Sequence, residues 1–434
     1  MTVTVDQAKL VLNSFSTILQ NNMVSADVVS WKEHDGELDD RNALQYAEQK
    51  APRYAVVETT DGVADLTSGV QGSVFGSEQF KVNKTFNTSM GWGDFVKIRD
   101  IGQARESEAL NGAATSMAEY IDAYVLKFAA NSAANWVGTP GLSIDNQDEV
   151  ASAYTRLKNE GVQDMNLNAV INFNDQQGLG NQVVNLAAPD AMATQTFRNR
   201  FKGMVAGLPT HFTQQLGVLT VGTRAASGAA LINGASQNKN YKDVAVSSAP
   251  GYFMTQTLTV DGLAASATVK AGEVFTVAGV NAYDNRKGAA QEFARQFTVV
   301  ADATMDGTGA GTLTIFPAMI VPASGSGEDI NINTAHATVD AAPADNAAIT
   351  FLGTASTGYT SRMVIQKQAI RVNTVPLIMP ATGTAYRRKL SKVPLSVRMW
   401  MHSDFNTGAH SVRFDVALTA NVVDRLRVCR FNGV

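Results

Sequence analysis

One uninterrupted helical stretch constrains the fold of this chain more than any other feature. Residues 103–131 contain no proline, and the weakest helix former among them is Gly112, which costs about 1 kcal/mol relative to alanine. Apolar residues recur at steps of three and four, which places them in one stripe along a helix. At 1.5 Å per residue the helix would be about 43 Å long, and helices in globular domains average about 11–12 residues. The stripe consists of Leu110, Ala113, Ala114, Met117, Ile121, Tyr124, Val125 and Phe128.

Two interpretations of this helix remain open at this point. It is either the core helix of a large α/β or α+β domain, or the spine of a subunit that forms a shell. In both cases the stripe should pack against a sheet or a second helix of the same chain. We expect its packed core to consist of Leu110, Met117, Ile121, Tyr124 and Phe128. The charged residues of the stretch fall mostly outside the stripe; they are Arg105, Glu108, Glu119 and Asp122.

Composition limits the class of protein. The chain has 434 residues, 45% of them hydrophobic, which is enough for two or three folded domains. Its formal net charge is −4, whereas a protein that mainly grips nucleic acid is usually strongly basic. The single cysteine, Cys429, allows no intramolecular disulfide. The sequence shows neither a signal peptide nor an apolar run of 18 residues, so we expect no membrane span.

The first half of the chain predicts two segments that bury little of their own surface. Residues 1–51 form an N-terminal arm with weak helices at 5–18 and 42–49 around an acidic run at 33–40. Residues 52–98 form an extended β-hairpin loop, with strand-like runs at 54–58 and 79–88 joined by a Gly/Ser-rich middle. A hairpin with little core of its own needs a partner. We therefore predict a subunit interface at the large apolar groups of this loop, Phe75, Phe80, Phe86 and Trp92.

The second half alternates between core-like and small-residue segments. A helix at 145–159 and strands at 168–173 and 218–221 precede a composition shift near residue 225, and a basic cluster occurs at Arg198, Arg200 and Lys202. Between residues 225 and 342 short strands and turn signals predict an inserted all-β module, a barrel or sandwich. Its expected strands are 255–260, 267–270, 273–277, 297–300, 312–316 and 329–333, with 283–295 as a loop or short helix. Alternation then predicts an antiparallel pair at 395–401 and 412–418.

No motif in the sequence indicates catalysis. The glycine-rich run at 307–311 precedes a strand and not a helix, so we interpret it as a hairpin turn and not a phosphate loop. His402 and His410 flank one loop but have no carboxylate or cysteine at ligand spacing. Cys429 has the context of an inert packing residue. The basic run at 387–389 fits a solvated loop or a salt-bridge patch between subunits. We expect no catalytic residue, no cofactor and no metal.

The order of these elements, with several short segments, resembles the major capsid proteins of tailed bacteriophages, which share the Hong Kong 97-type fold. It is most similar to the coat proteins of the short-tailed Salmonella phage type, which carry an inserted β-domain. The segments that carry the resemblance are FVKIRD at 95–100, NFNDQ at 172–176, AGEVFTVAGV at 271–280, and FTVV at 297–300 followed by TLTI at 312–315. The similarity is weak at individual positions but extends over nearly the whole chain from about residue 54.

The resemblance implies an α+β subunit and assigns its parts. The peripheral domain would comprise residues 99–161, with the spine helix, and the closing strands at 391–434. The axial domain would comprise residues 162–227 and 343–390, and the inserted β-barrel or sandwich domain residues 228–342. The arm at 1–51 and the extended loop at 52–98 would complete the subunit.

The implied function is a major capsid protein that assembles into the icosahedral shell around the double-stranded DNA of a tailed phage. Implied partners are other copies of the chain in hexamers and pentamers, a scaffolding protein, a portal and DNA on the inner face, with a decoration protein left open and no membrane. The protein would be made in the host cytoplasm and end in the virion. Two alternatives remain: a secreted β-rich adhesin or surface-layer protein, suggested by residues 225–342, and an enzyme with an unrecognised site.

Overall fold

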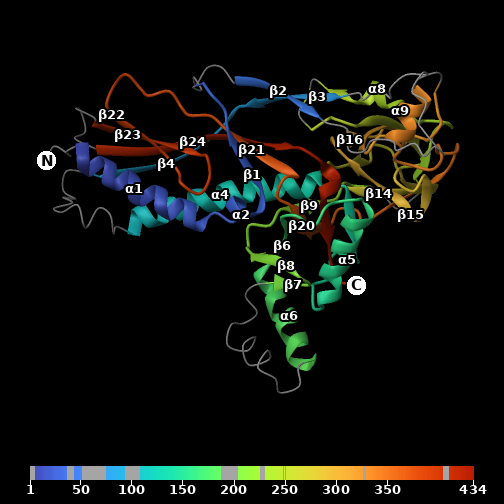
Figure 1. The fold of residues 1–434 in the computed structure, drawn as a ribbon, viewed down its shortest axis with the longest axis horizontal. Helices are drawn as coiled ribbons and strands as arrows, with labels where there is room; N and C mark the ends of the chain where they lie inside the picture. The colour runs from blue at the N-terminus through green and yellow to red at the C-terminus, as the bar shows by residue number, and fades with distance from the viewer. Residues whose placement is uncertain are drawn as a thin grey trace, which may run out of the picture.

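The computed structural model describes residues 5–36, 44–50, 75–92, 108–186, 204–224, 230–247, 249, 251–325, 329–403 and 410–434. Within them the chain is a mixture of helices and strands arranged around one long helix, α4 (Glu108–Ser132). Figure 1 shows α4 running across the middle of the molecule, with a sheet along it on one side, a barrel at one end and α6 projecting downward. The described part of the predicted spine helix is therefore helical, and residues 103–107 lie outside the described ranges.

The first sheet covers α4 and contains strands from distant parts of the sequence. Its order is β1 (Ser30–Glu33), β21 (Ile370–Thr374), β24 (His410–Val422), β23 (Ser396–Ser403) and β22 (Thr384–Lys389). A sixth strand, β4 (Lys84–Trp92), pairs with β24 beyond the end of β21. The predicted closing pair is thus the centre of this sheet, and its loop at 404–409 is outside the described residues.

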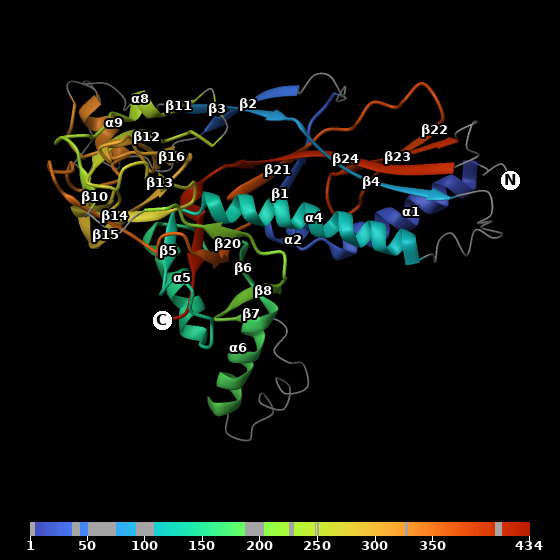
Figure 2. The same cartoon turned by 180° about the vertical axis from the view of Figure 1, so that it is seen from behind.

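The N-terminal segment packs on its own subunit. Helix α1 (Val5–Asn22) lies along α4, followed by the short α2 (Ser25–Val28), as the reverse view in Figure 2 also shows. Its apolar stripe is buried in the same cluster as the α4 stripe, and the Phe15 ring stacks on Phe414 with centroids 3.9 Å apart. The buried stripe is Ala8, Leu12, Phe15 and Leu19. This part of the expected arm is therefore held by the chain itself.

The two strands on either side of the extended loop form an antiparallel ribbon, and one of them differs from the prediction. The segment expected to be a helix at 42–49 is strand β2 (Leu44–Lys50), which pairs antiparallel with β3 (Gly76–Val82) from Leu44↔Val82 to Lys50↔Gly76. Its residues favour a helix, but cross-strand pairing decides the outcome, since local propensity is a weak influence. The expected strand at 54–58 and the Gly/Ser-rich middle lie outside the described residues, as does the segment at 95–100.

A second six-stranded sheet lies on the other side of α4. Its order is β5 (Asn135–Val137), β25 (Val428–Phe431), β20 (Arg362–Gln366), β6 (Leu167–Ile171), β8 (Leu208–Phe212) and β7 (Met204–Val205). Helix α5 (Gln147–Asn159) packs on it, starting at a capping box formed by Asn146 and Glu149. Helix α6 (Phe173–Leu186) follows β6. The basic cluster at Arg198, Arg200 and Lys202 is outside the described residues.

The inserted module is a closed barrel. Its strands are β10 (Ala230–Ile232), β12 (Gln256–Asp261), β17 (Gly311–Phe316), β15 (Ala289–Val299), β14 (Val274–Asp284) and β18 (Ala348–Phe351), in that order around the ring. Because β18 closes the ring between β14 and β10, the module extends to residue 351 and not to 342. Closure leaves the barrel no free edge.

Two predictions inside the module are wrong. The polar stretch at 283–295 is neither a long loop nor a helix, because most of it lies in the hairpin of β14 and β15. Most of its side chains are exposed or half-exposed, apart from the buried Arg295, so the stretch shows no clear apolar alternation. The expected strand at 329–333 is helix α9 (Asp329–Ala335), which packs beside α8 (Tyr241–Val244).

Candidate functional site

The candidate functional surfaces of this subunit are the seams where its parts meet, beginning with the spine helix. Leu110, Met117 and Ile121 are buried, whereas Tyr124 and Phe128 are half-buried at the edge of the same cluster. The apolar residues packed in the same cluster come from β23 and β24, the antiparallel pair that alternation predicts at 395–401 and 412–418; they include Val397, Met399, Phe414 and Val416. The Tyr124 hydroxyl accepts a hydrogen bond from the Ala420 backbone N–H at 3.3 Å.

Asp122 is a buried residue that the sequence interpretation placed outside the stripe. Its carboxylate accepts backbone N–H groups from Val24 at 2.7 Å and Ser25 at 3.0 Å, which joins the start of α2 to the middle of α4. Burial raises the pKa of Asp122 above its ordinary value, although these hydrogen bonds and the charge of Lys392 act in the opposite direction. Asp122 lies one helical turn from the apolar residues Ala118 and Leu126. This spacing was the feature of the sequence that could have predicted its burial.

The four aromatic residues predicted at a subunit interface have different surroundings. Phe80 is 3% exposed and packs in its own chain against Val375, Leu377 and Tyr46, so its assignment to a subunit interface is wrong. The reason is that β3 lies over the first sheet and buries this ring there. Phe86 is half-buried, 5.6 Å from the Tyr124 ring. Phe75 is 52% exposed, and the side chain of Trp92 is outside the described residues.

Buried charges join the inserted barrel to the rest of the subunit. Arg295 on β15 donates to the Glu160 carboxylate at 2.8 Å, and Arg156 on α5 lies 3.6 Å from the other oxygen of Glu160. Near the entry to the barrel, Arg224 pairs with the fully buried Glu273 at 2.8 Å. Removing one member of a buried pair is costly because the other stays uncompensated. These pairs therefore oppose separation of the barrel from the core.

Hydrogen bonds and one cation–π contact around strand β5 complete this seam. Trp136 donates its backbone N–H to the Gln296 side chain at 2.8 Å, and the Gln296 amide donates to the Trp136 carbonyl at 2.8 Å. The Thr298 hydroxyl donates to the Ala133 carbonyl at 2.8 Å. The Arg430 guanidinium lies 4.5 Å from the Trp136 ring centroid and donates to the carbonyl of Gly272. The barrel is thus bound to the residues that follow α4 and to strands β5 and β25 of the second sheet.

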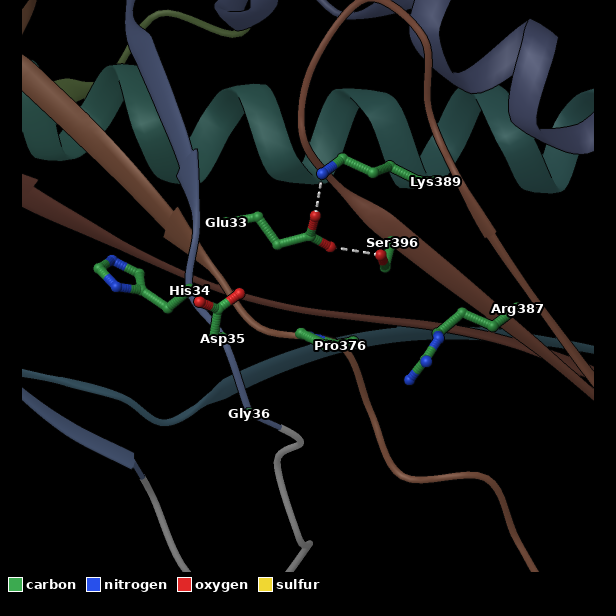
Figure 3. A pocket seen from close by; sticks show the side chains of 8 residues that line it. All are labelled: Glu33, His34, Asp35, Gly36, Pro376, Arg387, Lys389 and Ser396. Atoms are coloured by element: carbon green, nitrogen blue, oxygen red, sulfur yellow. Dashed lines mark hydrogen bonds and ion pairs between the residues drawn. The ribbon is translucent and has the colours of Figure 1, made fainter.

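A charged cleft of about 470 Å³ opens where β1 ends beside β22 and β23. Figure 3 shows the Glu33 carboxylate between Lys389, with which it forms an ion pair, and the Ser396 hydroxyl. His34 turns away from them and contacts the Asn373 side chain at 2.8 Å. The basic run at 387–389 is therefore part of strand β22 and not a loop. The paired charges in this cleft fit a structural role.

The described residues contain no assembled catalytic or metal centre. Among them, no group of three or more His, Cys, Asp or Glu side chains is placed to hold a metal ion. The glycine-rich run at 307–311 is a turn whose Thr308 and Ala310 N–H groups bond to Asp306, as the hairpin interpretation predicts. Burial raises the pKa of the Cys429 thiol to about 12, which keeps it protonated and unreactive at neutral pH. No helix of the described ranges has the length and hydropathy needed to cross a membrane.

These features define a structural subunit: a sheet on a spine helix, a docked barrel, and a β-ribbon of β2 and β3. The chain belongs to the P22 coat protein family, since the family described as "P22 coat protein - gene protein 5" matches residues 2–425. It is a major capsid protein of a bacteriophage with a mixed α+β fold, and its copies form an icosahedral head shell. The resemblance seen in the sequence is thereby confirmed.

Solved structures with similar folds are distant in sequence. One titled for Mycobacterium phage Che8 is 9% identical, with a TM-score of 0.40 over 95% of this chain and 92% of that one. The capsid structure of the cyanophage P-SCSP1u is 8% identical, with a TM-score of 0.41 over 95% and 88%. A virus-like particle from Pyrococcus furiosus is 6% identical, with a TM-score of 0.39 over 97% and 98%. No curated protein matches the chain.

Proposed function

We propose that the chain builds the head of a tailed bacteriophage as hexamers and pentamers, and that the shell encloses double-stranded DNA. The observation that carries this proposal is the family match over residues 2–425. The secreted adhesin or surface-layer protein and the unrecognised enzyme have no support beside it. In this proposal the protein uses no cofactor and catalyses no reaction, and it is made in the host cytoplasm before it enters the virion.

The parts of the subunit take distinct roles in this proposal. We assign the first sheet with α1 and α4 to the peripheral domain, and the second sheet with α5 and α6 to the axial domain around the five- and six-fold axes. This assignment differs from the sequence-based ranges, because it moves β5, α5 and β25 to the axial domain and β21 and β22 to the peripheral domain. The barrel at 230–351 is the inserted domain. Its closed ring, whose six strands all lie in one continuous stretch of the chain, favours independent folding. The ribbon of β2 and β3 starts the extended loop toward a neighbouring copy, and the exposed Phe75 supplies apolar surface for that contact.

Several partners follow from this role. A scaffolding protein and a portal would guide assembly, the DNA would lie against the inner face, and a decoration protein is an optional addition. The near-neutral charge of −4 fits a container better than a DNA-gripping protein.

The test is assembly by the purified chain. Size-exclusion chromatography and sedimentation should separate subunits or capsomers from closed particles, with particles favoured at higher protein concentration. A scaffolding protein from the same source can be added where the chain alone assembles slowly. A chain that stays monomeric at every concentration, with and without scaffolding protein, contradicts the proposal.

A further inference from the structure

The ribbon of β2 and β3 carries two acidic side chains directly opposite each other. Glu48 and Glu78 are cross-strand partners in its register, and the last pair before the loop is Lys50 and Gly76. Like charges at directly opposed positions destabilise an antiparallel pair. The ribbon therefore needs positive charge from elsewhere near its described end, where Lys50 pairs with Gly76.

The body of the subunit supplies one arginine to each glutamate. Arg371 on β21 forms an ion pair with Glu48, and Asn421 adds a hydrogen bond at 3.4 Å to the other oxygen. Arg425, in the turn after β24, lies close enough to Glu78 for the Glu78 charge to act on it. Burial lowers the pKa of Arg425 to about 10, and the charge of Glu78 acts against this shift. Docking thus compensates the repulsion within the ribbon.

A segment of the inserted domain pairs with the edge of β3 that faces away from β2. Strand β11 (Val246–Ser247) pairs parallel with β3, Val246 opposite Ser77, and the Ser77 N–H donates to the Ala245 carbonyl at 3.1 Å. The Gly251 N–H donates to the buried Glu78 carboxylate, while the Gly251 carbonyl accepts from Arg425 at 2.8 Å. One peptide segment therefore connects the ribbon, the inserted domain and the C-terminal turn.

Gly76 shows how closely these parts approach. A Cβ atom at this position would lie 2.2 Å from the Phe253 ring and 2.4 Å from the Ala245 carbonyl oxygen. Real Cβ atoms do not approach other atoms that closely, so any side chain here would push β3 away from residues 245–253. The contact that the glycine permits is made only with the inserted domain.

We propose that residues 241–247 and 251–254 of the inserted domain, together with Arg425, form a clamp on β3 that fixes the direction of the ribbon of β2 and β3, to which the extended loop is joined. The inserted domain thereby acts on assembly through the loop of its own chain. This inference rests on the proposed function, because the direction of the loop matters only if the loop reaches a neighbouring copy. When the clamp is displaced, the subunit still folds, but the ribbon of β2 and β3 takes a different direction. Shells then form in low yield or with an irregular shape.

The first test fixes the clamp with a disulfide. Ser77→Cys and Val246→Cys place two thiols at opposed positions of neighbouring strands, which lie about 4.8 Å apart, within the range that a disulfide spans. The native Cys429 is buried and does not compete. We expect the bond to form in the free full-length subunit, and the oxidised subunit to assemble as well as the reduced one. Failure to form the bond, or assembly only after reduction, overturns the proposal.

The second test opens the clamp with one methyl group. Gly76→Ala should speed amide exchange at residues 76–78 of the free subunit by at least about tenfold and reduce the yield of regular shells. Gly112→Ala is the matched control, because nothing lies within 4 Å of a Cβ there, and it should change neither property. Gly76→Ala subunits that exchange slowly and assemble normally contradict the clamp.

The two tests separate this inference from the proposed function. If the wild-type chain forms no shells, the proposed function fails, yet disulfide formation and amide exchange in the free subunit still report on the clamp. If the wild-type chain forms shells and the Gly76→Ala chain forms them equally well, only the clamp fails.

Discussion

The buried ion triad at the seam of the inserted barrel predicts which of two substitutions destabilises the subunit more. Glu160 interacts with both Arg295 and Arg156, and the three side chains are 4%, 4% and 11% exposed. Glu160→Gln leaves two buried guanidinium groups without their shared carboxylate, so we expect a loss of about 3–5 kcal/mol in the free energy of unfolding. Arg295→Met leaves Glu160 with Arg156, so its cost should be smaller, about 1–3 kcal/mol.

The assay is urea unfolding of the free full-length subunit, followed by far-ultraviolet circular dichroism and by tryptophan fluorescence. Asp164→Asn is the control, because its pair with Lys158 is on the surface of the same region and should leave the midpoint unchanged. A Glu160→Gln variant that loses less stability than Arg295→Met, or a control that loses as much, refutes the reasoning that a shared buried carboxylate holds the seam.

Three further predictions concern buried side chains of the spine helix and of strand β3. Ile121→Ala should cost the free subunit about 2–5 kcal/mol in urea unfolding, whereas the exposed Glu119→Ala should be close to silent; equal effects would contradict the packing of the stripe. Phe80→Ala should lower the free subunit's stability by about 3–5 kcal/mol, and an effect seen only in assembled shells would restore the subunit-interface assignment. Because the pKa of Asp122 is raised on folding, the folded state binds more protons, so stability should fall as pH rises above the ordinary aspartate range; melting temperatures of wild type and Asp122→Asn should differ in that slope, and parallel curves would exclude the effect.

The inserted domain gives a prediction about independent folding. Residues 230–351, expressed alone, should show a β-type circular dichroism spectrum and one cooperative melt, because all six strands of the barrel lie within this range. The isolated domain loses the contacts of Glu160, so its midpoint should be lower than in the full chain. A random-coil spectrum would contradict independent folding.

Local periodicity explains which parts of the fold the sequence could predict. The α4 stripe and the alternation in β23 and β24 each repeat over several turns or residues, so tertiary contacts reinforce the local pattern. The segment of β2 has helix-forming residues and becomes a strand only because β3 pairs with it. The hairpin of β14 and β15 is not predictable from alternation because the residues of its outer half are mostly exposed or half-exposed on both strands.

The seams were not predictable because their residues are far apart in the sequence. Arg295 and Glu160 are separated by 135 positions, and Glu78 and Gly251 by 173. No spacing rule connects charges at such distances, so these pairs could not be predicted from the sequence. The aromatic ring of Phe80 was assigned to a neighbouring subunit for the same reason: the surface that covers it, near Val375 and Leu377, follows almost 300 residues later.

The most direct test of the whole account is an image reconstruction of particles assembled from the purified chain by electron cryomicroscopy. We predict a closed icosahedral shell in which each barrel stays docked at the seam of Glu160 and Arg295, and residues 51–75 contact a neighbouring subunit. Open sheets or discrete monomers, or a shell in which residues 51–75 contact only their own subunit, would contradict the account.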